Sequence, residues 1–139
     1  MNQPKHVLDG YKVLDFSQIV AGPTCTLMLA EMGAEVIKVE LVPAGDGARV
    51  GPIVIDGRSG YFVQHNRGKK DLCIDAKTPE GLKILKGLVE KVDVLVENYA
   101  PGVIGRLGLD YDVVSKLNPR LVMCSISAFG QTGPLAQEP

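Results

Sequence analysis

Basic side chains close to predicted strand ends are the first candidates for chemistry in this sequence of 139 residues. Arg106 follows the segment ENYAPG, and a guanidinium can hold two phosphate oxygens at once. The segment NRGKKDLCIDAK contains Arg67, Lys69, Lys70 and Lys77, whose charges could also hold a phosphate. The alternatives are a surface ion pair for Arg106 and a solvated turn for the other four residues.

The segment QIVAGPTCTLMLAEMGAEVIKVE has the order of a dinucleotide-binding unit, with a small-residue turn, a helix, a strand and a final acid. Its turn reads Ala21-Gly22-Pro23 and lacks the G-x-G-x-x-G pattern that lets a pyrophosphate approach the backbone. The N–H groups at this helix start could hold an anion, or the turn could simply begin the helix. Glu40 stands where a ribose-binding acid would stand, but without the glycines a solvated acid at a strand end is favoured.

Candidates for a catalytic group are few. His6 and His65 have no evident Ser or Cys partner, and no CxxC or HExxH spacing indicates a metal site. Asp15 and Glu40 cannot be assigned as an acid–base pair from the sequence. The residues alone therefore predict an α/β nucleotide-like binding domain without a convincing catalytic group.

Composition argues against several classes of partner. The formal net charge is -1, aromatic residues make up 5% and Trp is absent, which argues against nucleic acid as a partner. No apolar run approaches the roughly 18 residues of a membrane span, and the start has no signal-peptide core. Cys25, Cys73 and Cys124 lie far apart in apolar segments, which predicts reduced, buried thiols and a cytoplasmic protein.

Strands and helices alternate along the chain, which predicts an α/β fold: an open, mainly parallel sheet with helices on both faces, formed as one domain by residues 1–139. Strands are expected at residues 11–16, 35–40, 70–76, 92–97 and 121–126. Helices are expected from Pro23, from Pro79 after the capping residue Thr78, near residues 103–107 and at 112–117, with a loop at 41–58. Ligands of such sheets bind beyond the carboxyl ends of the strands, here at residues 18–22, 41–45, 75–77, 98–102 and 127–130.

Four motifs in sequence order resemble the class III coenzyme A transferases, the group that includes formyl-CoA transferase, carnitine CoA-transferase and α-methylacyl-CoA racemase. The motifs are VLDFSQIVAGPTCTLMLAEMGAEVIKVE, NRGKKDLCIDAKTPEGLKIL, VDVLVENYAPGVIGRLGLDY and LNPRLVMCSISAFGQTGP. The resemblance implies a Rossmann-like N-terminal domain that binds coenzyme A or acyl-CoA as a substrate, with no permanently bound cofactor. It further implies a carboxylic acid acceptor and a homodimer whose full-length chains interlock.

The resemblance also assigns CoA-binding positions, none of which follows from spacing alone. They are Val20, Ala21, Leu41, Asp75, Ala76, Lys77, Asn98, Tyr99, Ala100 and Arg106. Lys77 is implied near the CoA phosphates, and Arg106 is implied to bind phosphate. Leu41 corresponds to a position near the adenine that is often Arg in the family, so a charge or cation–π contribution would be missing there.

No catalytic residue is assigned within the sequence, because the resemblance places the nucleophilic Asp beyond residue 139. In family transferases this Asp attacks the acyl-CoA thioester and forms a mixed anhydride, from which acyl exchange moves CoA to the acceptor. Residues 1–139 are therefore expected to be the N-terminal part of a longer acyl-CoA:carboxylate CoA-transferase, inactive alone. The alternatives are a 2-methylacyl-CoA racemase of the same superfamily and a stand-alone nucleotide-binding module.

Overall fold

A five-stranded, fully parallel sheet organises the protein in the computed structural model, which describes residues 6–138. Its strands are β1 Lys12–Asp15, β2 Glu35–Leu41, β5 Lys70–Ile74, β6 Val94–Glu97 and β7 Val122–Ser125. They lie in the order β5-β2-β1-β6-β7, and each neighbouring pair is parallel. The order reverses direction between β1 and β6, where an open sheet of this kind has its ligand-binding crevice. The predicted fold class is confirmed.

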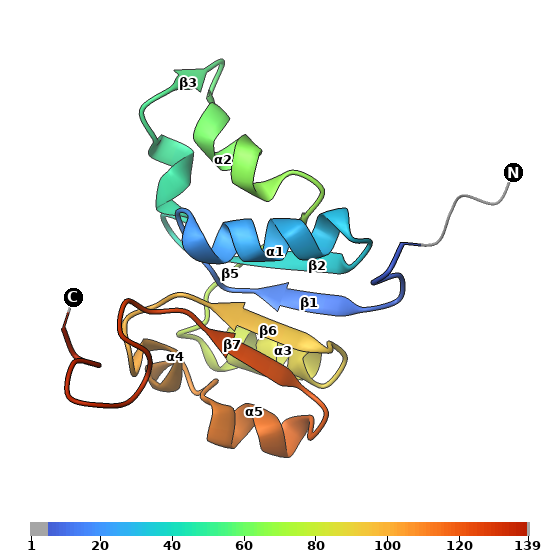
Figure 1. The fold of residues 1–139 in the computed structure, drawn as a ribbon, viewed down its shortest axis with the longest axis vertical. Coiled ribbons are helices and arrows are strands. Elements are labelled where there is room, and N and C mark those ends of the chain that lie inside the picture. The colour runs from blue at the N-terminus through green and yellow to red at the C-terminus, as the bar shows by residue number, and fades with distance from the viewer. Residues whose placement is uncertain (1–5, 139) are drawn as a thin grey trace, which may run out of the picture.

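Helices cover both faces of the sheet (Figure 1). On one face lies α1 Ala21–Glu31, with α2 Gly60–Asn66 beside it. On the other lie α3 Pro79–Val89, α4 Val103–Arg106 and α5 Tyr111–Leu117. Alternation along β1 divides the core, because successive side chains of a strand point to opposite faces. Val13 joins the cluster under α1, and Leu14 joins the larger cluster with Leu85 and Leu95.

The predicted helix boundaries have the expected local causes. The Thr78 side chain accepts a hydrogen bond from the Gly81 N–H at the start of α3, and Pro79 occupies the first helical position. Gly33 follows the end of α1 with φ of 103°, a left-handed conformation that favours glycine. Each predicted strand of the sheet is present, with ends within two residues of those expected.

The stretch predicted as a loop contains ordered elements that the sequence analysis missed. Residues 47–59 form the short 3-10 helix η1 Gly47–Val50 and a hairpin of β3 Val54–Ile55 with β4 Arg58–Ser59, after which α2 begins. Asp56 and Gly57 form the two-residue turn of the hairpin, both with positive φ. Asp-Gly is a favoured pair for a two-residue hairpin turn, so this element was readable from the sequence.

One prediction about the cysteines is wrong. Cys73 is exposed, because it lies on the edge strand β5, and Cys25 and Cys124 are half-buried rather than buried. All three are free thiols. Across residues 6–138, no helix has the length and apolar character needed to span a membrane.

Candidate functional site

The predicted ligand-binding loops meet at the carboxyl ends of the parallel strands, on the side where α4 and the segment after β7 lie (Figure 1). We call this end of the sheet the strand-end edge. At the point where the strand order reverses, the loop after β1 contacts the loop after β6. The Asn98 carboxamide accepts a hydrogen bond from the Gln18 N–H at 2.7 Å and donates one to the Gln18 carbonyl at 2.8 Å. Asn98 therefore holds the backbone of Gln18 as a neighbouring strand would.

Gly22 is needed for packing at this edge. A Cβ atom at Gly22 would lie 2.7 Å from Ser17 Oγ and closer still to Ser17 Cβ, so only glycine lets the first turn of α1 pass over Ser17. Pro23 stands in the same first turn, where a missing N–H is tolerated. The Ala21-Gly22-Pro23 turn thus brings the helix close to the strand end.

A buried ion pair lies beneath the loop after β1. Asp15 is fully buried and accepts hydrogen bonds from the Ser17 N–H at 2.9 Å, from the Ser17 hydroxyl and from the Thr26 hydroxyl at 2.6 Å. Lys69 Nζ lies 3.0 Å from Asp15 Oδ2, and burial lowers the pKa of Lys69. Asp15 and Lys69 therefore serve the structure, and Lys69 is not available to a phosphate.

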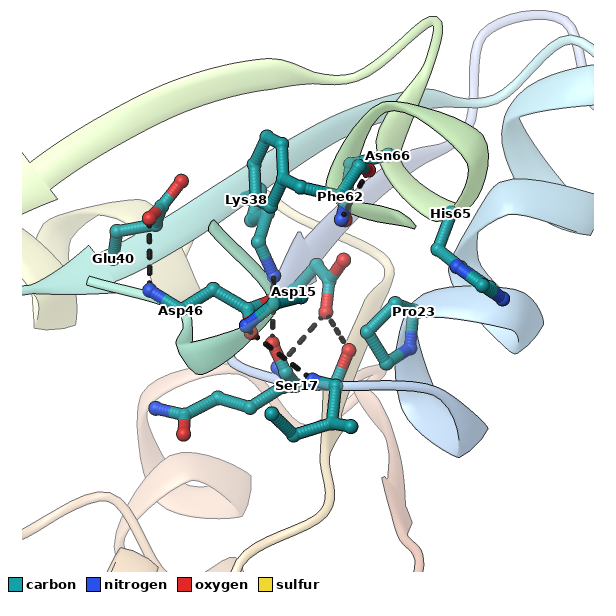
Figure 2. Close-up of polar contacts among 12 residues, drawn as sticks. Asp15, Ser17, Pro23, Lys38, Glu40, Asp46, Phe62, His65 and Asn66 are labelled. Atoms are coloured by element: carbon teal, nitrogen blue, oxygen red, sulfur yellow. Dashed lines mark hydrogen bonds and ion pairs between the residues drawn. The ribbon is translucent and has the colours of Figure 1, made fainter. Parts of the chain in front are cut away.

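A second buried pair supports the same loop from β2 (Figure 2). Lys38 Nζ donates to the Ser17 carbonyl at 2.7 Å and lies 2.8 Å from Asp46 Oδ2. Asp46 Oδ1 accepts from the N–H groups of Ile19 at 3.1 Å and Ala48 at 2.9 Å. Burial alone would raise the pKa of Asp46, but the bonds from Lys38, Ala48 and Ile19 outweigh it and hold that pKa below its usual value.

Glu40 corrects the expectation of a solvated acid. It is only 4% exposed, and its carboxylate accepts hydrogen bonds from the Asp46 N–H at 2.9 Å and from the Arg49 guanidinium. Arg49 also pairs with Asp71 at 2.9 Å and stacks over the Phe62 ring, 3.9 Å from its centroid. Although burial favours the protonated form, the bonds from Arg49 and the Asp46 N–H keep the pKa of Glu40 lowered.

The ten positions assigned by resemblance line the strand-end edge, with differing exposure. Val20, Ala21, Lys77, Ala100 and Arg106 are exposed, Leu41, Asp75, Asn98 and Tyr99 are half-buried, and Ala76 is buried. Asp75 shapes its loop, since its carboxylate accepts from the Lys77 N–H at 2.9 Å. The Tyr99 hydroxyl is buried without a hydrogen-bond partner among residues 6–138, and burial raises the pKa of Tyr99 to about 12.

The basic candidates separate into paired and unpaired residues. Arg67 pairs with Glu31, Lys69 with Asp15, and Lys70 with Glu35. Within the described part of the chain, Lys77 and Arg106 have no ion-pair partner. Neither Arg106 nor Lys77 is therefore neutralised by an acidic side chain of residues 6–138.

Two hollows flank this edge. One, of about 460 Å³, lies beside α4 and the end of β7 and includes Ile104, Met123 and Ser125 in its lining. The other, of about 260 Å³, follows the end of β2 and is lined partly by Glu40, Arg49 and Cys73. Among residues 6–138, no cluster of three His, Cys, Asp or Glu side chains could hold a metal ion.

Comparison with known proteins identifies the family of the chain. A family model described as CoA-transferase family III matches residues 8–139. The chain belongs to this family. It is 44% identical over 131 residues to the succinyl-CoA:glutarate CoA-transferase of Homo sapiens, a match that covers 94% of this chain and 30% of that protein. It is 44% identical over 125 residues to the formyl-CoA:oxalate CoA-transferase of Afipia carboxidovorans, covering 88% of this chain and 29% of that protein.

A solved structure of the family has the same fold. The CAIB/BAIF family protein of Brucella suis superposes with a TM-score of 0.90 at 41% identity, over 97% of this chain and 37% of that one. The chain spans about a third of the length of the relatives that it matches. The fold and family drawn from the four motifs are confirmed.

The sequence analysis missed the residues that support the site from below. Lys38 stands in the otherwise apolar strand segment EVIKVEL, and a lysine in such a position needs a buried partner. That partner, Asp46, comes from a loop that the sequence does not place. The exposed cations Lys77 and Arg106 therefore lie at the rim of a site whose buried charges neutralise one another.

Replacing Gly22 by Ala should destabilise the protein, although Gly-to-Ala changes inside a helix normally stabilise it by roughly 0.5–1 kcal/mol. We expect a loss of about 1–3 kcal/mol, because the new methyl overlaps Ser17 and the backbone must shift. Gly87→Ala in α3 is the matched control, since its Cβ would meet nothing within 4 Å, and it should stabilise. Urea unfolding measures both; a Gly22→Ala protein as stable as Gly87→Ala would contradict the close approach.

Stability should also fall with acid in a way that depends on Asp46. A carboxylate with a lowered pKa in the native state binds more protons in the unfolded state. Its contribution to the free energy of unfolding is therefore present above the unfolded pKa, near 3.8, and is lost as the pH falls through the native pKa. The stability difference between the unaltered protein and Asp46→Asn should therefore narrow from pH 5 to pH 3. Unfolding by urea at each pH measures it, and a constant difference would show that folding does not lower the pKa of Asp46.

Proposed function

We propose that this chain is the CoA-binding portion of an acyl-CoA:carboxylate CoA-transferase. The observation that carries the proposal is the pair of unpaired cations, Arg106 and Lys77, at the strand-end edge of a chain that belongs to CoA-transferase family III. All other basic residues considered for phosphate binding are neutralised by acids. The matched relatives are named for a CoA thioester and a carboxylate, which supports the same substrate classes here.

Coenzyme A carries phosphates, an adenosine and a long polar arm, and several loops can share these parts. Arg106 suits bidentate binding of a phosphate. Lys77 adds a point charge in the loop after β5, three strands away along the same row of strand ends. Leu41 offers the adenine an apolar contact only. The exposed residues Val20 and Ala21 at the start of α1 can contact the arm of the ligand, because Gly22 lets the helix lie close to the strand end.

The chemical step needs a group outside these residues. In the proposed mechanism, a carboxylate beyond residue 139 attacks the thioester carbonyl, the carbon–sulfur bond breaks and CoA leaves as a thiolate. The CoA thiolate then attacks the enzyme's own carbonyl in the mixed anhydride and releases the donor acid. The acceptor carboxylate attacks the resulting enzyme thioester and displaces the thiolate, which finally attacks the acceptor's carbonyl to give the new acyl-CoA and the free enzyme carboxylate. Residues 1–139 would hold CoA during this exchange and would not catalyse it alone.

We also propose that the full-length protein is a cytoplasmic homodimer. Apolar side chains stand exposed on the segment around η1 and β3, where Val50 is 85%, Ile53 63% and Ile55 69% exposed. Exposed apolar groups that gather in one region are typical of contact surfaces. This segment can therefore be covered by another part of the assembled protein.

Arg106→Ala should weaken CoA binding by about ten- to a hundredfold, since a hydrogen bond to a charged partner contributes roughly 1.5–3 kcal/mol. Lys77→Ala should cost less, because an ammonium is more strongly hydrated and lacks the guanidinium fork. Calorimetric titration of CoA and dephospho-CoA into the 139-residue protein and its variants measures these effects.

Arg120→Ala is the matched control, because Arg120 is also exposed but lies before β7, at the amino ends of the strands. It should bind CoA as the unaltered protein does. If Arg106→Ala folds and also retains full affinity, Arg106 is not the phosphate anchor. If the unaltered protein binds no CoA, these residues do not form the proposed site by themselves.

A further inference from the structure

Two side chains from different loops hold the short segment that leads into the proposed CoA contacts Val20 and Ala21. Asn98, after β6, makes both of its hydrogen bonds with the backbone of Gln18, at 2.7 and 2.8 Å. Asp46, after β2, accepts the next N–H along the chain, that of Ile19, at 3.1 Å. Consecutive amides of one loop are thus fixed by two elements that lie on either side of β1.

The segment needs such support because Ile19 has an unfavourable backbone conformation. Its φ is 66°, in the left-handed region that β-branched residues rarely adopt. Its side chain also packs closely against η1, since a Cβ at Gly47 would lie 3.0 Å from Ile19 Cδ1. A conformation of this kind persists when its surroundings determine it, and such residues cluster at functional sites.

The two oxygens of Asp46 have separate tasks. Oδ2 lies 2.8 Å from Lys38 Nζ, while Oδ1 accepts from the backbone N–H groups of Ile19 and Ala48. Lys38 in turn donates to the Ser17 carbonyl at 2.7 Å, one residue before Gln18. The ion pair therefore fixes Asp46 at the place from which it can hold Ile19.

We propose that Asp46 and Asn98 are positioning residues, which hold the backbone of Gln18 and Ile19 so that Val20 and Ala21 are presented to coenzyme A. This inference rests on the proposed function. It gives Asn98 a different role from the direct ligand contact expected by family resemblance, since its carboxamide already bonds Gln18 on both sides. It also assigns a role in binding to Asp46, which lies outside the ten positions assigned by resemblance.

The first test is amide hydrogen exchange of the 139-residue protein without ligand. Asn98→Ala should speed exchange at the Gln18 N–H, and loss of Asp46 should speed exchange at the Ile19 N–H, each by about tenfold or less if one net hydrogen bond is lost. Asp46→Ala is combined with Lys38→Met, so that no unpaired charge remains buried. Amides of the central strands β1 and β6 serve as the internal control and should not change.

The second test is a double-mutant cycle in CoA affinity. Asn98→Ala and the combined change Asp46→Ala with Lys38→Met should each raise the Kd for CoA by about two- to tenfold. The control Asp112→Ala, at an exposed site on α5, should leave the Kd unaltered. Because Asp46 and Asn98 act on one segment, the variant that carries both changes should bind CoA no more weakly than whichever separate variant binds it less tightly. Effects that multiply would show an independent contact of Asn98 with CoA and would overturn the shared role.

The two tests separate this inference from the proposed function. If the unaltered protein binds no CoA, residues 1–139 do not form the proposed CoA site by themselves, and the exchange rates still decide whether Asp46 and Asn98 hold the segment. Unchanged exchange at both Gln18 and Ile19 in folded variants would overturn the positioning role, whatever the affinity for CoA.

Discussion

Two buried ion pairs that meet at Ser17 are the constraint on which the rest of this edge depends. Asp15 pairs with Lys69 and bonds the Ser17 N–H and hydroxyl, while Lys38 pairs with Asp46 and bonds the Ser17 carbonyl. Removing charges from water is costly unless geometry and further hydrogen bonds compensate. Here each pair has such bonds, so the loop after β1 has one well-determined conformation.

This constraint produces a contrast between the interior and the surface of the edge. Alternation along the strands directs Asp15, Lys38 and Glu40 to the face covered by α1, where each acquires an opposite charge from another segment. Lys77 and Arg106 lie at the outer rim and have no ion-pair partner in the described part of the chain. An anion that reaches the rim therefore meets free positive charge over a scaffold whose own charges are neutralised.

The sequence predicted the sheet and most helices, because hydrophobic alternation and the Thr78-Pro79 start are local signals. It missed the hairpin at Asp56-Gly57, although that turn was readable, because the surrounding Gly and Pro suggested only loop. It was wrong about Glu40, whose partner Arg49 lies on a 3-10 helix that could not be placed. The pairing of Lys38 with Asp46 likewise depends on long-range packing, which composition and spacing do not specify.

Mapping the amide chemical shifts during titration with CoA tests the central claim most directly, namely that the ligand binds beyond the carboxyl ends of the parallel strands. We predict shifts concentrated at residues 18–22, 75–77 and 98–106, on the three loops that carry most of the candidate residues. Residues 90–93 and 118–121, at the amino ends of β6 and β7, should be unaffected. Shifts centred on those amino ends, or on the Arg49–Phe62 stack, would contradict the account.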